Sequence, residues 1–266
     1  MTLLRSVAVL PTVRERKGYP FDLPLIQSLP ELDVSVPVTF LVGENGSGKS
    51  TLLEAIGASV GSVTIGGAPI AADPRLAPAR RLADCLRLTW SRKTRLGFYM
   101  RAEDFITWTD RSVELLGELD DLAEEARTNR DTGGGDWWRA EAVARGERAL
   151  LQRGLGAEFD ARSHGESFLD MFGQRLRPGG LHLLDEPETP LSPLRQLALL
   201  ALIRDTANEG GQFIVATHAP ILLACPGATI LQIDGDRLAP VAYDDVPNVR
   251  LMRDFLADPA AYLRYL

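Results

Sequence analysis

Glycines, a lysine and hydroxyl side chains are spaced along residues 43–51 in a way that could hold a chain of phosphates. The segment reads GENGSGKST and matches the pattern G-x-x-x-x-G-K-[ST]. In such a loop the backbone N–H groups at the start of a helix point at phosphate oxygens. We predict that Lys49 reaches the β- and γ-phosphates and that the Ser50 hydroxyl binds Mg²⁺. The predicted nucleotide contacts are Gly43, Glu44, Asn45, Gly46, Ser47, Gly48, Lys49, Ser50 and Thr51.

Two adjacent carboxylates, Asp185 and Glu186, end a second apolar run with the sequence LHLLDEP. Neighbouring side chains on a strand point in different directions, so the two carboxylates can have separate tasks. We predict that Asp185 belongs to the Mg²⁺ shell and that Glu186 orients and deprotonates water. The alternative is an acidic strand end without a chemical role.

Two further segments could complete a phosphate site. His218 ends the apolar run QFIVATH and is predicted to contact the γ-phosphate, although a single histidine is more often structural. In SHGES, Ser163 and Gly165 open a predicted helix whose free N–H groups would form a second anion site. Ser163 could instead be an ordinary N-cap, with Glu166 closing a capping box.

The apolar pattern predicts the elements that must position these residues. Continuous apolar strands separated by amphipathic helices predict a parallel sheet covered on both faces. The composition changes at the acidic, helical segment 104–130, which the glycines of DTGGGDWW interrupt. Strands are expected at 3–10, 38–42, 181–187 and 212–218, helices at 49–59 and 194–210, short β segments at 62–70 and 85–90, a hairpin at 229–243, and two short helices split near Pro259.

Composition limits the classes of protein that fit. The chain has 266 residues, 45% of them hydrophobic, which is enough for a full core. Its longest apolar run, residues 197–203, is far shorter than the roughly 20 residues of a membrane span, so we expect no membrane insertion. Cys85 and Cys225 form no C-x-x-C motif, which favours a reducing compartment and a cytoplasmic location. The net charge of −7 argues against a surface that attracts nucleic acid everywhere, although basic clusters occur at 14–17 and 91–95.

Four motifs occur in the order found in the ABC-type ATPase superfamily. They are the Walker A segment GENGSGKST, the signature segment SHGES, the Walker B segment LHLLDEPE and the switch segment THAP. The chain resembles the small soluble members of that superfamily, which are related to chromosome-maintenance, RecF-like and DNA-repair ATPases. The resemblance implies an α/β P-loop NTPase fold with a mostly parallel sheet, an N-terminal antiparallel β part and a helical subdomain inserted at about 104–162 of a single domain, 1–266. It implies ATP and Mg²⁺ as cofactors. It also implies ATP hydrolysis in a head-to-tail homodimer, with each ATP between one protomer's Walker A segment and the partner subunit's Ser163 and Gly165.

Several positions depart from the transporter cassettes of the superfamily. Arg162 and His164 stand where those cassettes carry leucine and glycine, and Ser192 stands where an aspartate is expected after Walker B. The expected glutamine before the insertion is missing, and the segment GFYMRAEDF offers Arg101 and Glu103 instead. Of these two, Glu103 is predicted as the Mg²⁺ or water contact.

Two further expectations concern an aromatic residue and the length of the insertion. Tyr19 lies where an aromatic residue often stacks on adenine in the superfamily, or it is a partly buried loop residue. The insertion is too short for the arms of chromosome-maintenance proteins, and we expect a compact helical lobe.

Three biological roles to which ATP hydrolysis could be coupled are compatible with these motifs. The first is DNA maintenance, repair or defence, with DNA as a partner. The second is the ATP-binding cassette of a membrane transporter, which the altered signature disfavours. The third is a nucleotide-dependent switch that binds a protein partner, for which the acidic helix ELLGELDDLAEEA is a candidate docking face or simply a solvated surface.

Overall fold

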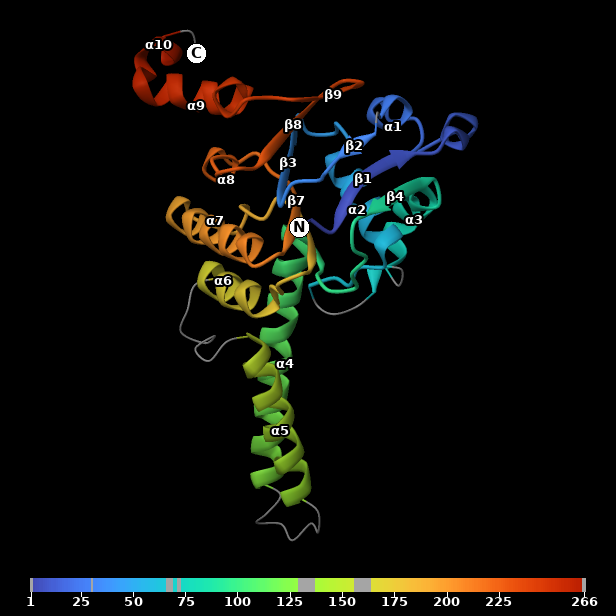
Figure 1. The fold of residues 1–266 in the computed structure, drawn as a ribbon. Coiled ribbons are helices and arrows are strands. Elements are labelled where there is room, and N and C mark those ends of the chain that lie inside the picture. Colours follow the sequence, from blue (N-terminus) through green and yellow to red (C-terminus); the bar gives the residue numbers. More distant parts are fainter. Residues whose placement is uncertain are drawn as a thin grey trace. The chain divides into compact units, whose positions relative to one another are not determined.

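The computed structural model describes residues 2–29, 31–65, 69–70, 73–128, 137–155 and 164–264 (Figure 1). The chain divides into two compact units. The first combines residues 1–102 and 175–266, and the second is residues 103–174. The second unit extends past the expected insertion of 104–162, because the helix at 164–175 belongs almost wholly to it.

The first unit is built on a six-stranded sheet with the order β5-β6-β7-β3-β8-β9. Every neighbouring pair is parallel except β8 and β9, which form the expected hairpin. All residues of β6 and β7 are buried, which explains their continuous apolar sequences. The strands are β3 (Val38–Gly43), β5 (Tyr99–Arg101), β6 (Leu181–Asp185), β7 (Gln212–Ala216), β8 (Thr229–Asp234) and β9 (Arg237–Pro240).

A smaller antiparallel sheet has the order β2-β1-β4, with β1 (Leu4–Val9), β2 (Leu32–Asp33) and β4 (Leu86–Trp90). The buried side chain of Gln212 joins it to the large sheet. Gln212 Oε1 accepts from the backbone N–H groups of Leu3 and Leu4 at 3.0 and 2.7 Å, and its Nε2 donates to Leu4 O at 2.8 Å. The expected mostly parallel α/β fold with an N-terminal antiparallel part is confirmed.

The helices of the first unit match most of the expected positions. Gly61 is the left-handed C-cap of α2 and ends the helix that follows the phosphate-binding loop. The helix α7 is amphipathic rather than fully buried, since Leu199, Ile203 and Thr206 are its buried residues. The helices are α1 (Pro24–Ser28), α2 (Lys49–Val60), α3 (Ala77–Ala83), α7 (Pro193–Asn208), α8 (Pro220–Leu223), α9 (Pro247–Ala257) and α10 (Pro259–Leu263), with 3₁₀ turns at 11–15, 74–76 and 243–245.

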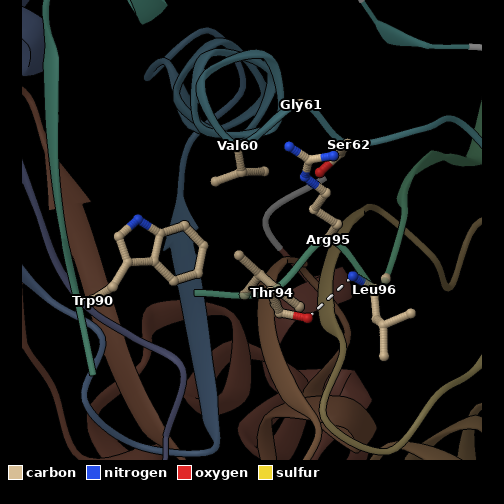
Figure 2. Close-up of a pocket in the computed structure, with 9 residues that line it drawn as sticks. Val60, Gly61, Ser62, Trp90, Thr94, Arg95 and Leu96 are labelled. Atoms are coloured by element: carbon tan, nitrogen blue, oxygen red, sulfur yellow. Dashed lines mark hydrogen bonds between the residues drawn. The ribbon is translucent and has the colours of Figure 1, made fainter. Parts of the chain in front are cut away.

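The short β segment expected at 62–70 is reduced to single bridges in the part of this segment that the structure describes. Val63 pairs with Pro69, and Thr64 pairs with Tyr99 at the edge of the large sheet. A small pocket lies beside these bridges, lined by Val60, Trp90, Thr94 and Arg95 among others (Figure 2). The Thr94 hydroxyl donates to Gly179 O and accepts from Leu96 N, both at 3.0 Å, so this hydroxyl holds the loop after β4 in place.

The second unit holds two long helices, α4 (Ala102–Thr128) and α5 (Trp137–Leu155), which lie side by side in Figure 1, followed by α6 (His164–Arg175). Arg127 of α4 pairs with Glu141 of α5 at 2.9 Å, and Asp120 pairs with Arg148 at 2.6 Å. From the first of these pairs to the second, the residue number falls along α4 and rises along α5, so the two helices are antiparallel.

The less exposed side chains of these two helices recur at alternating intervals of four and three residues. That repeat is the seam of a coiled coil, so the expected helical lobe contains a short antiparallel helical pair. The seam residues are Ser112, Leu116, Leu119, Ala123 and Ala126 on α4, and Trp137, Glu141, Ala144 and Arg148 on α5.

None of the helices within the described ranges has both the length and the apolar content that crossing a bilayer requires.

Candidate functional site

The phosphate-binding segment connects the end of β3 to the start of α2. Gly48, immediately before the helix, has φ = 98°, a left-handed conformation that glycine adopts without strain. Gly43 ends β3 so close to β8 that an added Cβ would lie 2.7 Å from Ile233 O. The two glycines are therefore required by the backbone path, and the first N–H groups of α2 are left open to an anion.

Lys49 lies over this loop. Its buried Nζ donates to Gly43 O at 2.6 Å and to Glu44 O at 3.0 Å. Burial lowers the pKa of Lys49, while the charges of Glu186, Asp185 and Glu188 act in the opposite direction. The ammonium group is thus held at the loop, where the negative charge of a phosphate chain would stabilise it further.

Ser50 and Asp185 meet although they are 135 residues apart in the chain. Ser50 Oγ donates to Asp185 Oδ1 at 3.1 Å. Burial raises the pKa of Asp185 to about 6, and the hydrogen bond from Ser50 and the charges of Arg101 and Lys49 oppose that rise. A hydroxyl oxygen beside a carboxylate oxygen is a donor set that suits Mg²⁺.

Across the described ranges, no group of three or more His, Cys, Asp or Glu side chains could hold a metal ion. Magnesium in nucleotide sites typically takes one or two protein oxygens and completes its shell with phosphate oxygens and water. The Ser50 and Asp185 pair therefore fits Mg²⁺ that arrives with a nucleotide.

Glu186 follows the end of β6 in an uncommon backbone conformation. Its φ is 48°, in the left-handed region that costs a residue with a Cβ about 1–2 kcal/mol. Its N–H donates to Ala216 O on β7 at 2.9 Å. Glu186 Oε1 lies 4.0 Å from His218 Nε2, and both side chains are partly exposed. Strain of this kind is concentrated at functional sites, where it aims a side chain.

Several buried polar atoms have no hydrogen-bond partner in the part of the chain that the structure describes, and two of them could donate to a ligand at this site. These two are Ser47 Oγ in the loop and His218 Nε2. A buried polar atom without a partner is costly, and a bound ligand or water that supplied one would remove that cost. Together with the open N–H groups and Lys49, these atoms fit the phosphates of a nucleotide.

Arg101 was one of the two residues offered at the position of the missing glutamine, and Glu103 was predicted in preference to it. It ends β5 in direct register with Asp185 of β6. Its guanidinium lies 3.0 Å from Glu54 Oε1 of α2 and donates from Nε to the Tyr99 hydroxyl at 2.9 Å. Strand pairing therefore brings Arg101 beside the Walker B carboxylate, whereas Glu103 lies in the exposed first turn of α4 and belongs to the second unit.

Glu188 was also missed, although the sequence DEPE showed a second glutamate nearby. Its Oε1 accepts from the backbone N–H of His218 at 2.7 Å. This hydrogen bond joins the turn after β6 to the turn after β7.

Tyr19 lies in the loop before α1, and its side chain contacts the first turn of α2. Its hydroxyl and the Thr51 hydroxyl are 2.8 Å apart, and the residue is 54% exposed. An aromatic face open to solvent beside the loop is compatible with adenine stacking, which stays a prediction.

The signature segment is described in part. Ser163 lies outside the described residues, and Gly165 lies in the first turn of α6. Its proposed contact with a partner's nucleotide also stays a prediction.

Comparisons with known proteins identify relatives of this chain. The model of an AAA domain described as "putative AbiEii toxin, Type IV TA system" matches residues 94–224, and that of a further AAA domain matches residues 26–114. The chain is 31% identical over 212 residues to the hemin import ATP-binding protein HmuV of Streptomyces coelicolor, covering 76% of this chain and 66% of that protein. It is 30% identical over 215 residues to HmuV of Pseudomonas fluorescens, covering 79% of this chain and 76% of that protein.

Among solved structures, a nucleotide-free ATP-binding cassette of an ABC transporter aligns with a TM-score of 0.47 at 15% identity, covering 100% of this chain and 99% of that one. The SMC head domain of Thermotoga maritima aligns with a TM-score of 0.40 at 16% identity, covering 91% and 100%.

The fold, the phosphate-binding loop and the relatives define a P-loop nucleotide-binding protein. Within that class, the chain belongs to the ABC-type ATPase family, as the sequence motifs predicted. It spans about two thirds of the length of the first of these relatives, the protein from Streptomyces.

Proposed function

We propose that this chain binds ATP with Mg²⁺ and hydrolyses it. The observation that carries the proposal is the 3.1 Å contact between Ser50 Oγ and Asp185 Oδ1, with Lys49 on the adjacent loop. It joins the phosphate-binding loop to the carboxylate strand, which is the arrangement that phosphoryl transfer needs.

Each side chain has a separate task in this proposal. Lys49 and the N–H groups of the loop bind the β- and γ-phosphates and offset their charge. Ser50 and Asp185 hold Mg²⁺, which would neutralise charge on the phosphate oxygens. Glu186 accepts the proton of the attacking water, and His218 contacts the γ-phosphate. Catalysis of this type depends mainly on positioning and electrostatic stabilisation.

Glu186→Gln is the direct test. We expect the variant to bind ATP normally and to lose about 10²–10⁴-fold in kcat, because a general base contributes about that much. The matched control is Glu209→Gln, the same chemical change at the exposed C-cap of α7, which should hydrolyse ATP at the parent rate. Hydrolysis by Glu186→Gln at the parent rate would exclude Glu186 as the base.

Hydrolysis is proposed to be coupled to DNA maintenance, repair or defence. The soluble-type signature SHGES and the DEPE variant support this output, and the AAA model with its AbiEii description is compatible with a defence role. The second candidate is the cassette subunit of a membrane transporter, which the hemin import relatives favour.

The steady-state ATPase rate with and without double-stranded DNA, at two salt concentrations, separates these outputs. Stimulation that weakens with salt supports the DNA role, because phosphate contacts release counterions. Co-purification with a membrane protein, without a DNA response, favours the transporter role. A slow rate that responds to neither favours a switch whose ATP-bound form binds a protein partner.

A further inference from the structure

The backbone of His218 is held from both sides by side chains of other elements. Glu188 Oε1 accepts from the His218 N–H at 2.7 Å. On the other side, Asn248 Nδ2 donates to the His218 carbonyl oxygen. The two peptide units that flank the His218 Cα are therefore both anchored, and the imidazole can move mainly by its own side-chain torsions.

Asn248 reaches His218 from α9, a helix that the proposed chemistry has not used. It is the second residue of α9, between Val246 and Val249, which are 2% and 3% exposed. The later residues Leu251, Met252 and Leu256 of the same helix are exposed. The first turn of α9 is thus packed into the first unit, and that packing fixes where the Asn248 amide lies.

The position of His218 matters because its side chain faces the proposed base. His218 Nε2 is 4.0 Å from Glu186 Oε1 and has no hydrogen-bond partner within the described residues. A group that must meet a phosphate oxygen at hydrogen-bond distance tolerates little displacement, since a shift of about 1 Å can cost about 10²-fold in rate. The backbone anchors on His218 therefore bear on the rate of hydrolysis.

We infer that Asn248 and Glu188 are positioning residues for His218, and that Asn248 makes the rate of hydrolysis depend on the placement of α9. This inference rests on the proposed role of His218 at the γ-phosphate. Asn248 acts through the His218 carbonyl group and takes no part in holding the nucleotide. Glu188 is less selective, because its charge also acts on Lys49. Displacement of α9 would change the rate of hydrolysis without changing ATP affinity.

The test is a double-mutant cycle between Asn248→Ala and His218→Ala. Asn248→Ala alone should lower kcat about tenfold and leave KM and the calorimetric ATP affinity unchanged, because a small displacement of His218 is costly for rate. In the His218→Ala background, the same substitution should have no further effect on kcat, since residues that act as one unit are non-additive. The control is Met252→Ala, at an exposed position of the same helix, which should behave as the parent chain.

Two results would overturn the inference. One is a parent-like kcat for Asn248→Ala. The other is an equal loss from Asn248→Ala with and without the imidazole, which is what a merely structural role predicts. Failure of the proposed function is distinguishable from these results, because the parent chain would then hydrolyse ATP no faster than Glu186→Gln.

Discussion

At the scale of single residues, burial sets the protonation of groups that the proposed chemistry does not use. His182 of β6 is fully buried between Phe98 and Phe213, with ring centroids 5.0 and 4.9 Å away. Its Nε2 lies 3.2 Å from Arg177 O, and its Nδ1 has no partner within the described residues. Burial lowers the pKa of His182 to about 4, so the folded protein holds a neutral ring at neutral pH.

This burial predicts a pH dependence of stability that His182→Phe should remove. Between about pH 6.5 and 4 the unfolded chain binds a proton that folded His182 does not, so the free energy of unfolding falls as pH falls, by about 3 kcal/mol in all. Asp185 contributes in the opposite direction between about pH 3.8 and 6. Its pKa is raised in the folded state, so the folded chain binds a proton there that the unfolded chain does not, and the free energy of unfolding rises as pH falls.

Denaturant unfolding of the parent chain and of His182→Phe, at pH 7 and at pH 4.5, isolates the histidine contribution. The Asp185 contribution is common to both proteins and cancels in the difference. The variant should gain stability relative to the parent as pH falls. A difference between the two proteins that does not change with pH would contradict a neutral buried His182.

At the scale of elements, the second unit depends on the seam between α4 and α5. Leu119 lies in this seam and is 5% exposed, whereas Leu122, one turn further along α4, is 54% exposed. Most of the described side chains of these two helices outside the seam are exposed, so a few seam contacts supply most of the apolar burial among the described residues.

Leu119→Ala should therefore destabilise the helical pair by about 2 kcal/mol, at the lower end for a buried leucine truncation because a two-helix layer relaxes easily. The matched control is Leu122→Ala, which should change stability by less than about 0.5 kcal/mol. Hydrogen exchange of the amides in 103–128 measures the local free energy of opening. Equal effects of the two variants would contradict the assignment of Leu119 to the seam between α4 and α5.

At the scale of the whole molecule, the resemblance to ABC-type ATPases predicts that two chains complete each ATP site. The first unit supplies Lys49, Ser50 and Asp185, and the signature segment with Ser163 and Gly165 is proposed to come from the partner subunit. ATP binding would then stabilise the dimer, and hydrolysis would allow the two chains to separate.

We expect Glu186→Gln to form a dimer with ATP and Mg²⁺ in light scattering, because ATP stays bound when hydrolysis stalls. Glu186→Gln with ADP and Lys49→Ala with ATP should both remain monomeric. Adding Ser163→Arg to Glu186→Gln should abolish the dimer while leaving ATP binding by the monomer intact. A Glu186→Gln protein that stays monomeric at saturating ATP would contradict the shared site.

Local patterns were enough to predict much of the fold. The phosphate-binding loop, the buried strands β6 and β7, the hairpin of β8 and β9 and the split between α9 and α10 were all visible in short segments. Each depends on periodicity or on glycine and proline within about ten residues, which a single sequence displays directly. The helix α3 was missed, because seven residues rich in arginine and alanine carry little periodic signal.

The sequence by itself determined the chemistry proposed for this protein, because Lys49, Ser50, Asp185 and Glu186 are identified by motif spacing and by the apolar strands before them. Only the tertiary structure decided which of these groups touch and what holds them. The Ser50 contact with Asp185, the register of Arg101 beside it and the hydrogen bond from Asn248 to His218 depend on strand order and helix packing. Such contacts join residues far apart in the chain, and no local pattern records them, because hydrogen-bond partners are chosen when the elements pack.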